Sequence, residues 1–123
     1  MKRKMLFTQF LRLLFILSAS SLFLQCSEEN PLAPDVRGAN EVWITANGFE
    51  PATLTVSAGT TVIWINKDSA NHTVDSGTPN QPTNQFSSPT IRPNADFSHK
   101  FDLAGTFNYY CARTLATGKI VVN

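Results

Sequence analysis

Residues 104–122 read AGTFNYYCARTLATGKIVV. Two runs rich in aromatic and β-branched residues, Thr106–Cys111 and Lys119–Val122, flank a short segment that ends in Thr117-Gly118. Runs of this kind between turn residues are typical of β-strands. The stretch therefore predicts two strands joined by a short loop, with the thiol of Cys111 at the end of the first strand.

Similar short runs occur upstream, and no helical period of useful length interrupts them. The expected strands are Glu41–Ala46, Ala52–Val56, Thr61–Asn66, a weak one at Gln85–Ser88, Asp96–Leu103, Thr106–Cys111 and Lys119–Val122. Between them, Asp68–Asn84 is rich in Asn, Thr, Pro and Gly, and we expect a long surface loop there. Six or seven short strands predict an all-β, antiparallel β-sandwich over residues 41–123.

The first 26 residues predict export. A basic start at residues 2–4 precedes the apolar stretch Leu13–Leu24, which is shorter than the roughly 20 residues of a membrane-spanning helix. Residues 1–25 are therefore interpreted as a signal peptide. Cys26 and the polar run after it resemble a bacterial lipoprotein cleavage site, so we expect lipidation of Cys26. Cleavage by an ordinary signal peptidase is the alternative, because Gln25 stands where a small residue is usual.

The mature chain is mildly acidic. Residues 26–40 contain prolines and acidic residues and predict a flexible tether. Without residues 1–25, six basic side chains face nine acidic ones, a net charge of −3 against +1 for the whole chain. Such a domain has no basic stripe for nucleic acid. The chain has two cysteines, too few for a disulfide framework or a four-thiolate zinc site.

Three short segments carry side chains capable of chemistry: NHTV at 71–74, SHK at 98–100 and YYCA at 109–112. A lone loop histidine is usually solvated, and a lone strand-end cysteine usually packs as a small apolar side chain. No paired carboxylates, serine motif or phosphate-binding loop is visible, so we expect no enzyme. A Cys–His hydrolase built on Cys111 and His72 would need an oxyanion hole and an orienting third residue, and the sequence reveals neither.

Six blocks in the domain resemble, in content and order, the cupredoxins, the plastocyanin-like blue copper proteins. The blocks are PATLTVSAG at 51–59, VIWINKD at 62–68, NHTV at 71–74, FSHKF at 97–101, AGTFNYYC at 104–111 and GKIVV at 118–122. The resemblance implies a Greek-key β-sandwich, a copper cofactor and one-electron transfer. It also implies that His72 supplies an imidazole ligand and Cys111 a thiolate, donors that suit copper in both oxidation states.

The sequence departs from this family after Cys111. A second ligand histidine usually follows the cysteine by three residues, where this chain has Thr114, and no methionine follows Met5 to serve as the weak axial ligand. Two of the four usual ligands are therefore absent. His99 would replace the imidazole if its strand formed a hairpin with the next one, because His99 and Cys111 would then be cross-strand neighbours about 5 Å apart at Cβ. We instead interpret His99 as a partly buried side chain that binds no metal.

These features favour an exported copper-binding protein of the cell envelope, a periplasmic or outer-surface lipoprotein whose inherited role is electron transfer. One alternative is a copper-delivery module without electron transfer, which holds copper through His72 and Cys111. Another is a degenerate interaction domain that has lost its metal. We expect a monomer that exchanges electrons or copper with a partner protein, and no nucleic-acid partner.

Overall fold

A computed structural model describes residues 35–123. The predicted signal peptide at 1–25, the predicted lipidation site Cys26 and most of the predicted tether lie outside the described residues. Within the described part, Val36–Asn123 form one compact unit, and no helix is long and apolar enough to cross a membrane.

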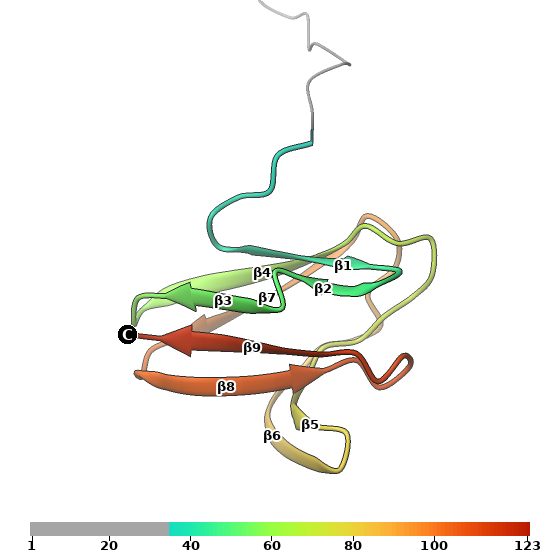
Figure 1. Ribbon diagram of the computed structural model, residues 1–123. Coiled ribbons are helices and arrows are strands. Elements are labelled where there is room, and N and C mark those ends of the chain that lie inside the picture. Colours follow the sequence, from blue (N-terminus) through green and yellow to red (C-terminus); the bar gives the residue numbers. More distant parts are fainter. Residues whose placement is uncertain (1–34) are drawn as a thin grey trace, which may run out of the picture. The chain divides into compact units, whose positions relative to one another are not determined.

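Residues 35–123 form nine strands and no helix (Figure 1). The strands are β1 (Glu41–Thr45), β2 (Gly48–Glu50), β3 (Thr53–Val56), β4 (Thr60–Asn66), β5 (Asp75–Thr78), β6 (Gln81–Ser87), β7 (Asp96–Phe101), β8 (Gly105–Tyr110) and β9 (Thr117–Val122). One sheet has the order β2-β1-β4-β7 and the other β3-β9-β8-β5-β6. The predicted all-β sandwich is confirmed, with two differences in pairing: β1 with β4 and β3 with β9 are parallel.

The core lies between the two sheets and is centred on Trp64. Alternation along β4 turns Val62, Trp64 and Asn66 inward, and all three are fully buried. The ring of Trp64 lies 5.3–6.3 Å, centroid to centroid, from the rings of Phe86, Phe97, Phe101 and Tyr109. Aromatic pairs of this geometry add about 0.5–1.5 kcal/mol each to the free energy of burial. This packing fixes the positions of the two sheets, and of the loops at their ends, relative to each other.

The expected surface loop over Asp68–Asn84 is wrong. β5 pairs with both β8 and β6, although its sequence, DSGT, contains no aromatic or aliphatic β-branched residue. The buried hydroxyl of Ser76 accepts hydrogen bonds from the backbone N–H groups of Gln85 and Phe86. Gly77 has φ +99° and no room for a Cβ atom, which would clash with the carbonyl oxygen of Gln81. Tertiary contacts, and not local propensity, form this strand.

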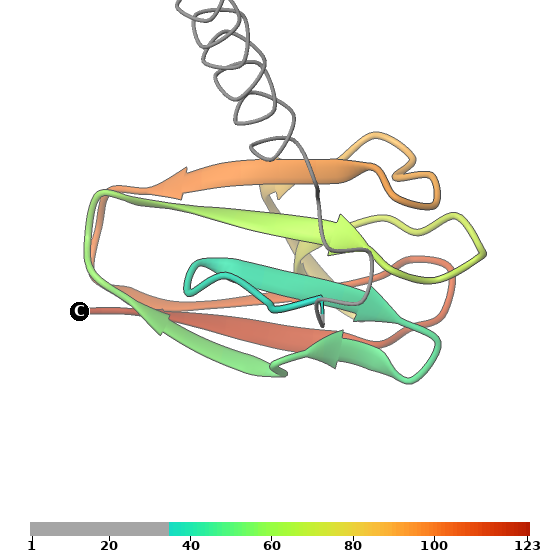
Figure 2. The same ribbon diagram turned by 90° about the horizontal axis from the view of Figure 1, so that it is seen from above.

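The loops that matter for the site lie at one end of the sandwich. In Figure 2 the β4–β5 and β8–β9 loops lie at the end opposite the C terminus, whereas the β7–β8 turn lies at the same end as the C terminus. His72 lies in the β4–β5 loop, and Cys111 directly follows β8. The two residues that the sequence singled out are therefore brought to the same end.

The hairpin that would have paired His99 with Cys111 does not form. β7 pairs with β4, which places His99 opposite Val62, while β8 pairs with β5 and β9 in the other sheet. The β7–β8 turn thus crosses from one sheet to the other. Leu103 leaves 75% of its surface exposed in that turn. Strand pairing therefore does not bring His99 next to Cys111, so the alternative in which His99 replaces the missing imidazole has no support from this pairing.

His99 is expected to titrate below its ordinary pKa of 6.5, because burial disfavours the imidazolium, although the charge of Asp102 acts in the opposite direction. The folded chain then binds fewer protons than the unfolded chain near pH 6. The contribution of His99 to stability is therefore present above pH 6.5 and is lost as the pH falls from 6.5 through the lower pKa of the folded state. An NMR titration of the His99 ring should give a midpoint below 6.5, and Asp102→Asn should lower it further. A midpoint at or above 6.5 in the unmodified protein would contradict the expectation.

Candidate metal centre

Cys111 begins a tightly closed loop. Its side chain is fully buried. The backbone N–H of Cys111 donates to the carbonyl of Ala116, and the N–H of Leu115 donates to the carbonyl of Cys111. Leu115 takes a left-handed φ of +61°, which closes the loop. These bonds hold the sulfur in place beneath residues 112–116.

His72 is buried, with only 3% of its surface exposed, and not solvated as its loop position suggested. Its backbone forms a bridge with Ile91: each residue donates its N–H to the carbonyl of the other, at 3.0 and 2.8 Å. The buried amide of Asn66 also donates to the carbonyls of Ala70 and Ile91. The loop that carries His72 is therefore fixed by backbone and amide hydrogen bonds.

The side chains of His72 and Cys111 are in contact. Nδ1 of His72 lies 3.6 Å from Sγ of Cys111 in a buried contact. Donor atoms about 2.0 Å (imidazole nitrogen) and about 2.3 Å (thiolate sulfur) from one tetrahedral metal ion lie about 3.6 Å apart. The separation of these two donors therefore fits shared coordination of one metal ion.

Asp68 orients the imidazole, and the sequence analysis missed it. Its Oδ2 lies 2.7 Å from Nε2 of His72. The hydrogen bond to His72, followed by that from the N–H of Ser69, lowers the pKa of the Asp68 carboxyl, so Asp68 is an acceptor at neutral pH. Nε2 must then carry the proton, and in a neutral ring the Nδ1 lone pair is directed to the side of the sulfur. The available signal was an aspartate four residues before His72.

The comparisons with known proteins identify the family. The sequence matches the cupredoxin-like domain over residues 13–122. The chain belongs to the cupredoxin-like family. Amicyanin-alpha of Methylorubrum extorquens is 30% identical over 86 residues, which span 69% of this chain and 72% of amicyanin. Plastocyanin of Scenedesmus fuscus is 32% identical over 69 residues, which span 51% of this chain and 70% of plastocyanin.

Solved structures agree with these sequence matches. A purple cupredoxin from Nitrosopumilus maritimus has a TM-score of 0.64 with 29% identity, covering 68% of this chain and 98% of its own. An amicyanin mutant in its Cu(I) form has a TM-score of 0.61 with 30% identity, covering 74% of this chain and 88% of its own. Cupredoxins are in general copper-binding electron carriers and not enzymes.

In this cupredoxin the sulfur of Cys111 is surrounded by hydrogen-bond donors. Burial opposes ionisation of the thiol, but hydrogen bonds to the sulfur, chiefly from the backbone N–H of Thr73 and from the hydroxyl and backbone N–H of Thr114, outweigh it. The pKa of Cys111 consequently falls to about 6. A thiolate, the form that binds metal, is therefore favoured at neutral pH.

The candidate site of this cupredoxin has two strong ligands, the side chains of His72 and Cys111. Among residues 35–123, no three His, Cys, Asp or Glu side chains gather closely enough to hold a metal ion. Thr114, at the sequence position of the family's second histidine, contributes only hydrogen bonds to the sulfur, from its hydroxyl and its backbone N–H. His99 stacks on Phe86 instead. The residues present thus fit a metal ion held by His72 and Cys111 but do not fit the complete four-ligand site.

A cavity of about 430 Å³ borders His72 on the outside of this pair. Its other lining residues are Asn71, Thr73, Thr90 and Arg113. The guanidinium of Arg113 donates to the carbonyl of Asn71 at 2.8 Å and so joins the β8–β9 loop to the β4–β5 loop. His72 therefore borders a cavity that the loops themselves do not fill.

Proposed function

We propose that this cupredoxin binds copper through Nδ1 of His72 and Sγ of Cys111, with one-electron transfer as its inherited role. The observation that carries this proposal is the 3.6 Å contact between the two donor atoms. The hydrogen bond from Nε2 of His72 to Asp68 supports it. A carboxylate that accepts a hydrogen bond from one ring nitrogen of a metal-binding histidine raises the basicity of the other nitrogen, here Nδ1.

The protein's part in this function is to hold donors and exclude water. Copper supplies one-electron chemistry by cycling between Cu(I) and Cu(II). Cys111 and His72 are buried and fixed by backbone hydrogen bonds, so their positions need little adjustment between the two oxidation states. Asp68 keeps the proton of His72 on the nitrogen away from the sulfur.

A copper-delivery function without electron transfer is the second candidate, and Thr114 favours it. A threonine hydroxyl is a poor copper ligand beside imidazole, so the inherited site has lost one strong ligand. A thiolate and one imidazole suit Cu(I) at low coordination. The degenerate interaction domain is the third candidate, but a buried Cys–His pair with an aspartate on the histidine gives it no specific support.

Titration of the purified protein with Cu(II), followed by visible absorption, tests the proposal. An intense thiolate-to-copper band at one equivalent would support an electron-transfer site. A colourless protein that still competes for Cu(I) against a chelator would support copper delivery. A colourless protein with no affinity for Cu(I), and with unchanged thermal unfolding when copper is added, would overturn copper binding altogether.

Asp68→Asn is expected to weaken copper binding about 10- to 100-fold, the usual effect of losing the carboxylate partner of a metal-binding histidine. Asp96→Asn is the matched control, because Asp96 is an exposed carboxylate at the start of β7 in the sheet away from Cys111. Competition titrations with Cu(I) would measure both variants. Equal affinity of Asp68→Asn and the unmodified protein would show that this hydrogen bond does not act through the metal site.

We further propose that the protein is exported and anchored in the cell envelope by a lipid on Cys26, where it meets a redox or copper-exchange partner. The support is the sequence pattern of residues 1–26. Mass spectrometry of the membrane fraction would reveal a diacylglyceryl modification on Cys26, and Cys26→Ser should release the protein into the soluble fraction. Unmodified, membrane-free protein would contradict the anchor.

A further inference from the structure

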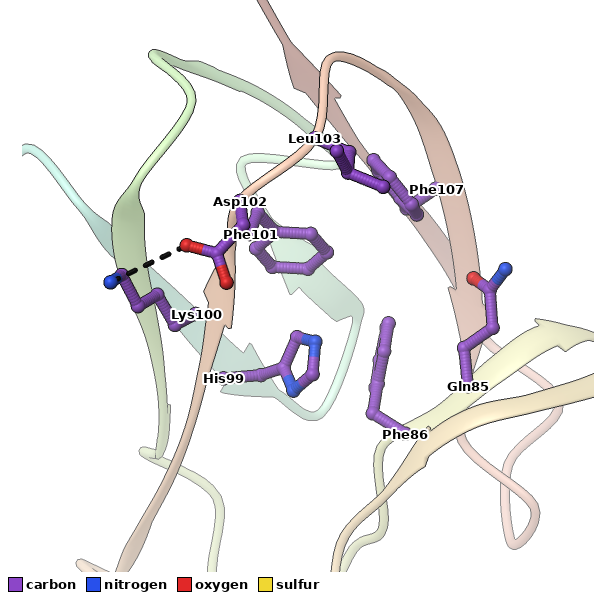
Figure 3. Close-up of a pocket in the computed structure, with 8 residues that line it drawn as sticks. All are labelled: Gln85, Phe86, His99, Lys100, Phe101, Asp102, Leu103 and Phe107. Carbon is purple, nitrogen blue, oxygen red and sulfur yellow. Dashed lines mark ion pairs between the residues drawn. The ribbon is translucent and has the colours of Figure 1, made fainter.

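A second cavity, of about 340 Å³, opens between β6 and β7, each of which is an edge strand of its sheet. Figure 3 shows its lining, half of which is aromatic. The lining residues are Gln85, Phe86, His99, Lys100, Phe101, Asp102, Leu103 and Phe107. The cavity borders the β7–β8 turn, at the end of the sandwich opposite the loops that carry Cys111 and His72 (Figure 2). It is therefore separate from the candidate metal centre.

The walls of this cavity are preformed. The ring of His99 stacks on Phe86 at 4.7 Å with an interplanar angle of 30°, and it meets Phe101 edge-on at 4.9 Å. Phe107 in turn packs on Phe101 at 5.1 Å. Phe86 and Phe101 are buried, so neither can rotate away from its neighbours. In Figure 3 these rings surround an open space. A planar apolar molecule would find aromatic surfaces already in place.

The polar groups of the cavity restrict which molecule fits. Within residues 35–123 neither ring nitrogen of His99 has a hydrogen-bond partner, although its ring is half-buried. Burial lowers the pKa of His99, which keeps the ring neutral at pH 7. One ring nitrogen can therefore accept a hydrogen bond. At the mouth, Nζ of Lys100 lies 3.4 Å from Oδ1 of Asp102, so the two charges compensate each other. The cavity therefore presents one unpaired neutral imidazole and no net charge.

We propose that this cavity binds an uncharged, planar aromatic molecule that carries a hydroxyl group. The ring system lies against Phe86 and Phe107, and the hydroxyl donates to His99. An aromatic carboxylate is disfavoured, because the only cation on the cavity wall, Lys100, is already paired with Asp102. A purely apolar ring would leave the imidazole without a partner.

Binding of 2-naphthol, followed by amide and aromatic NMR shifts of the purified protein, tests the proposal. We expect saturable shifts of Phe86, His99, Phe101 and Phe107 with a dissociation constant roughly in the 10⁻⁴ M range. Naphthalene and 2-naphthoate should bind about three- to tenfold more weakly, as expected from loss of one hydrogen bond. Shifts that depend on protein concentration and not on 2-naphthol would instead indicate self-association, and the absence of shifts in these residues would overturn the proposal.

Two variants locate the interactions. His99→Phe keeps a ring on Phe86 and should remove the preference for 2-naphthol over naphthalene. Leu103→Ala removes an exposed apolar side chain from the cavity lining and should weaken both ligands. Leu115→Ala alters another largely exposed leucine, outside the cavity, and should weaken neither. Thermal unfolding of each variant checks that it is folded. If 2-naphthol keeps its preference in His99→Phe, the hydroxyl is not recognised by His99 and the proposal fails.

Discussion

Replacing Cys111 by serine should abolish copper binding, with a loss of affinity on the order of a thousandfold or more. The thiolate is the softer of the two donors, and the lowered pKa of Cys111, about 6, makes it the anionic one at neutral pH. A serine hydroxyl stays protonated there and binds Cu(I) poorly. Any visible thiolate-to-copper band should disappear completely.

The fold should survive this change, which makes the result interpretable. Serine is close to cysteine in size, and the donors around position 111, Thr73 and Thr114, remain available to its oxygen. We expect a loss of at most about 1–2 kcal/mol in the free energy of unfolding. His72→Ala should weaken binding strongly but leave the thiolate. If copper binding survives in both variants, the metal is bound elsewhere and the proposed function fails.

Replacing Thr114 by histidine should have the second-largest effect, a gain of about a hundredfold in Cu(II) affinity, on the scale of one added strong ligand. The hydroxyl of Thr114 already hydrogen-bonds the sulfur of Cys111, so a side chain at this position reaches the donor pair. The residue is exposed, which leaves room for an imidazole. Titration with Cu(II) should then produce an intense visible band.

Leu115→His is the matched control for this gain. It adds an imidazole to the same loop, but at a side chain that is 61% exposed and makes no contact with the sulfur that we observe. Copper affinity and colour should stay close to those of the unmodified protein. If both variants gain affinity equally, the added imidazole acts as a surface ligand, and Thr114 does not mark the missing position of the site.

Much of the fold was predictable from short runs of residues. The alternation in Thr61–Asn66 and Thr106–Cys111 identifies strands because one face of each is buried, and the structure places strands there. β5 was missed because DSGT has no strand signal of its own and is held by the hydroxyl of Ser76 and by its neighbours. The parallel pairing of β1 with β4 was missed because the sequence of neither strand determines the direction in which the two strands pair.

The candidate site was predictable only in part. His72 and Cys111 were found through the family resemblance, and the structure places Nδ1 of His72 3.6 Å from Sγ of Cys111. Asp68 was missed because an isolated aspartate in a turn has no distinguishing pattern until the loop folds back and brings it to His72. His99 was placed near Cys111 only by assuming that consecutive strands form a hairpin.

The sequence by itself determined which chemical groups this cupredoxin has: one thiol and one imidazole in the family's positions, and a threonine in place of the second histidine. It also determined the all-β character, since alternation is a local property of the chain. Only the tertiary structure decided that Asp68 orients His72 and that His99 lines a separate aromatic cavity. The physical reason is that these contacts depend on how a turn crosses between sheets and how a loop folds back, which non-local hydrogen bonds and packing determine.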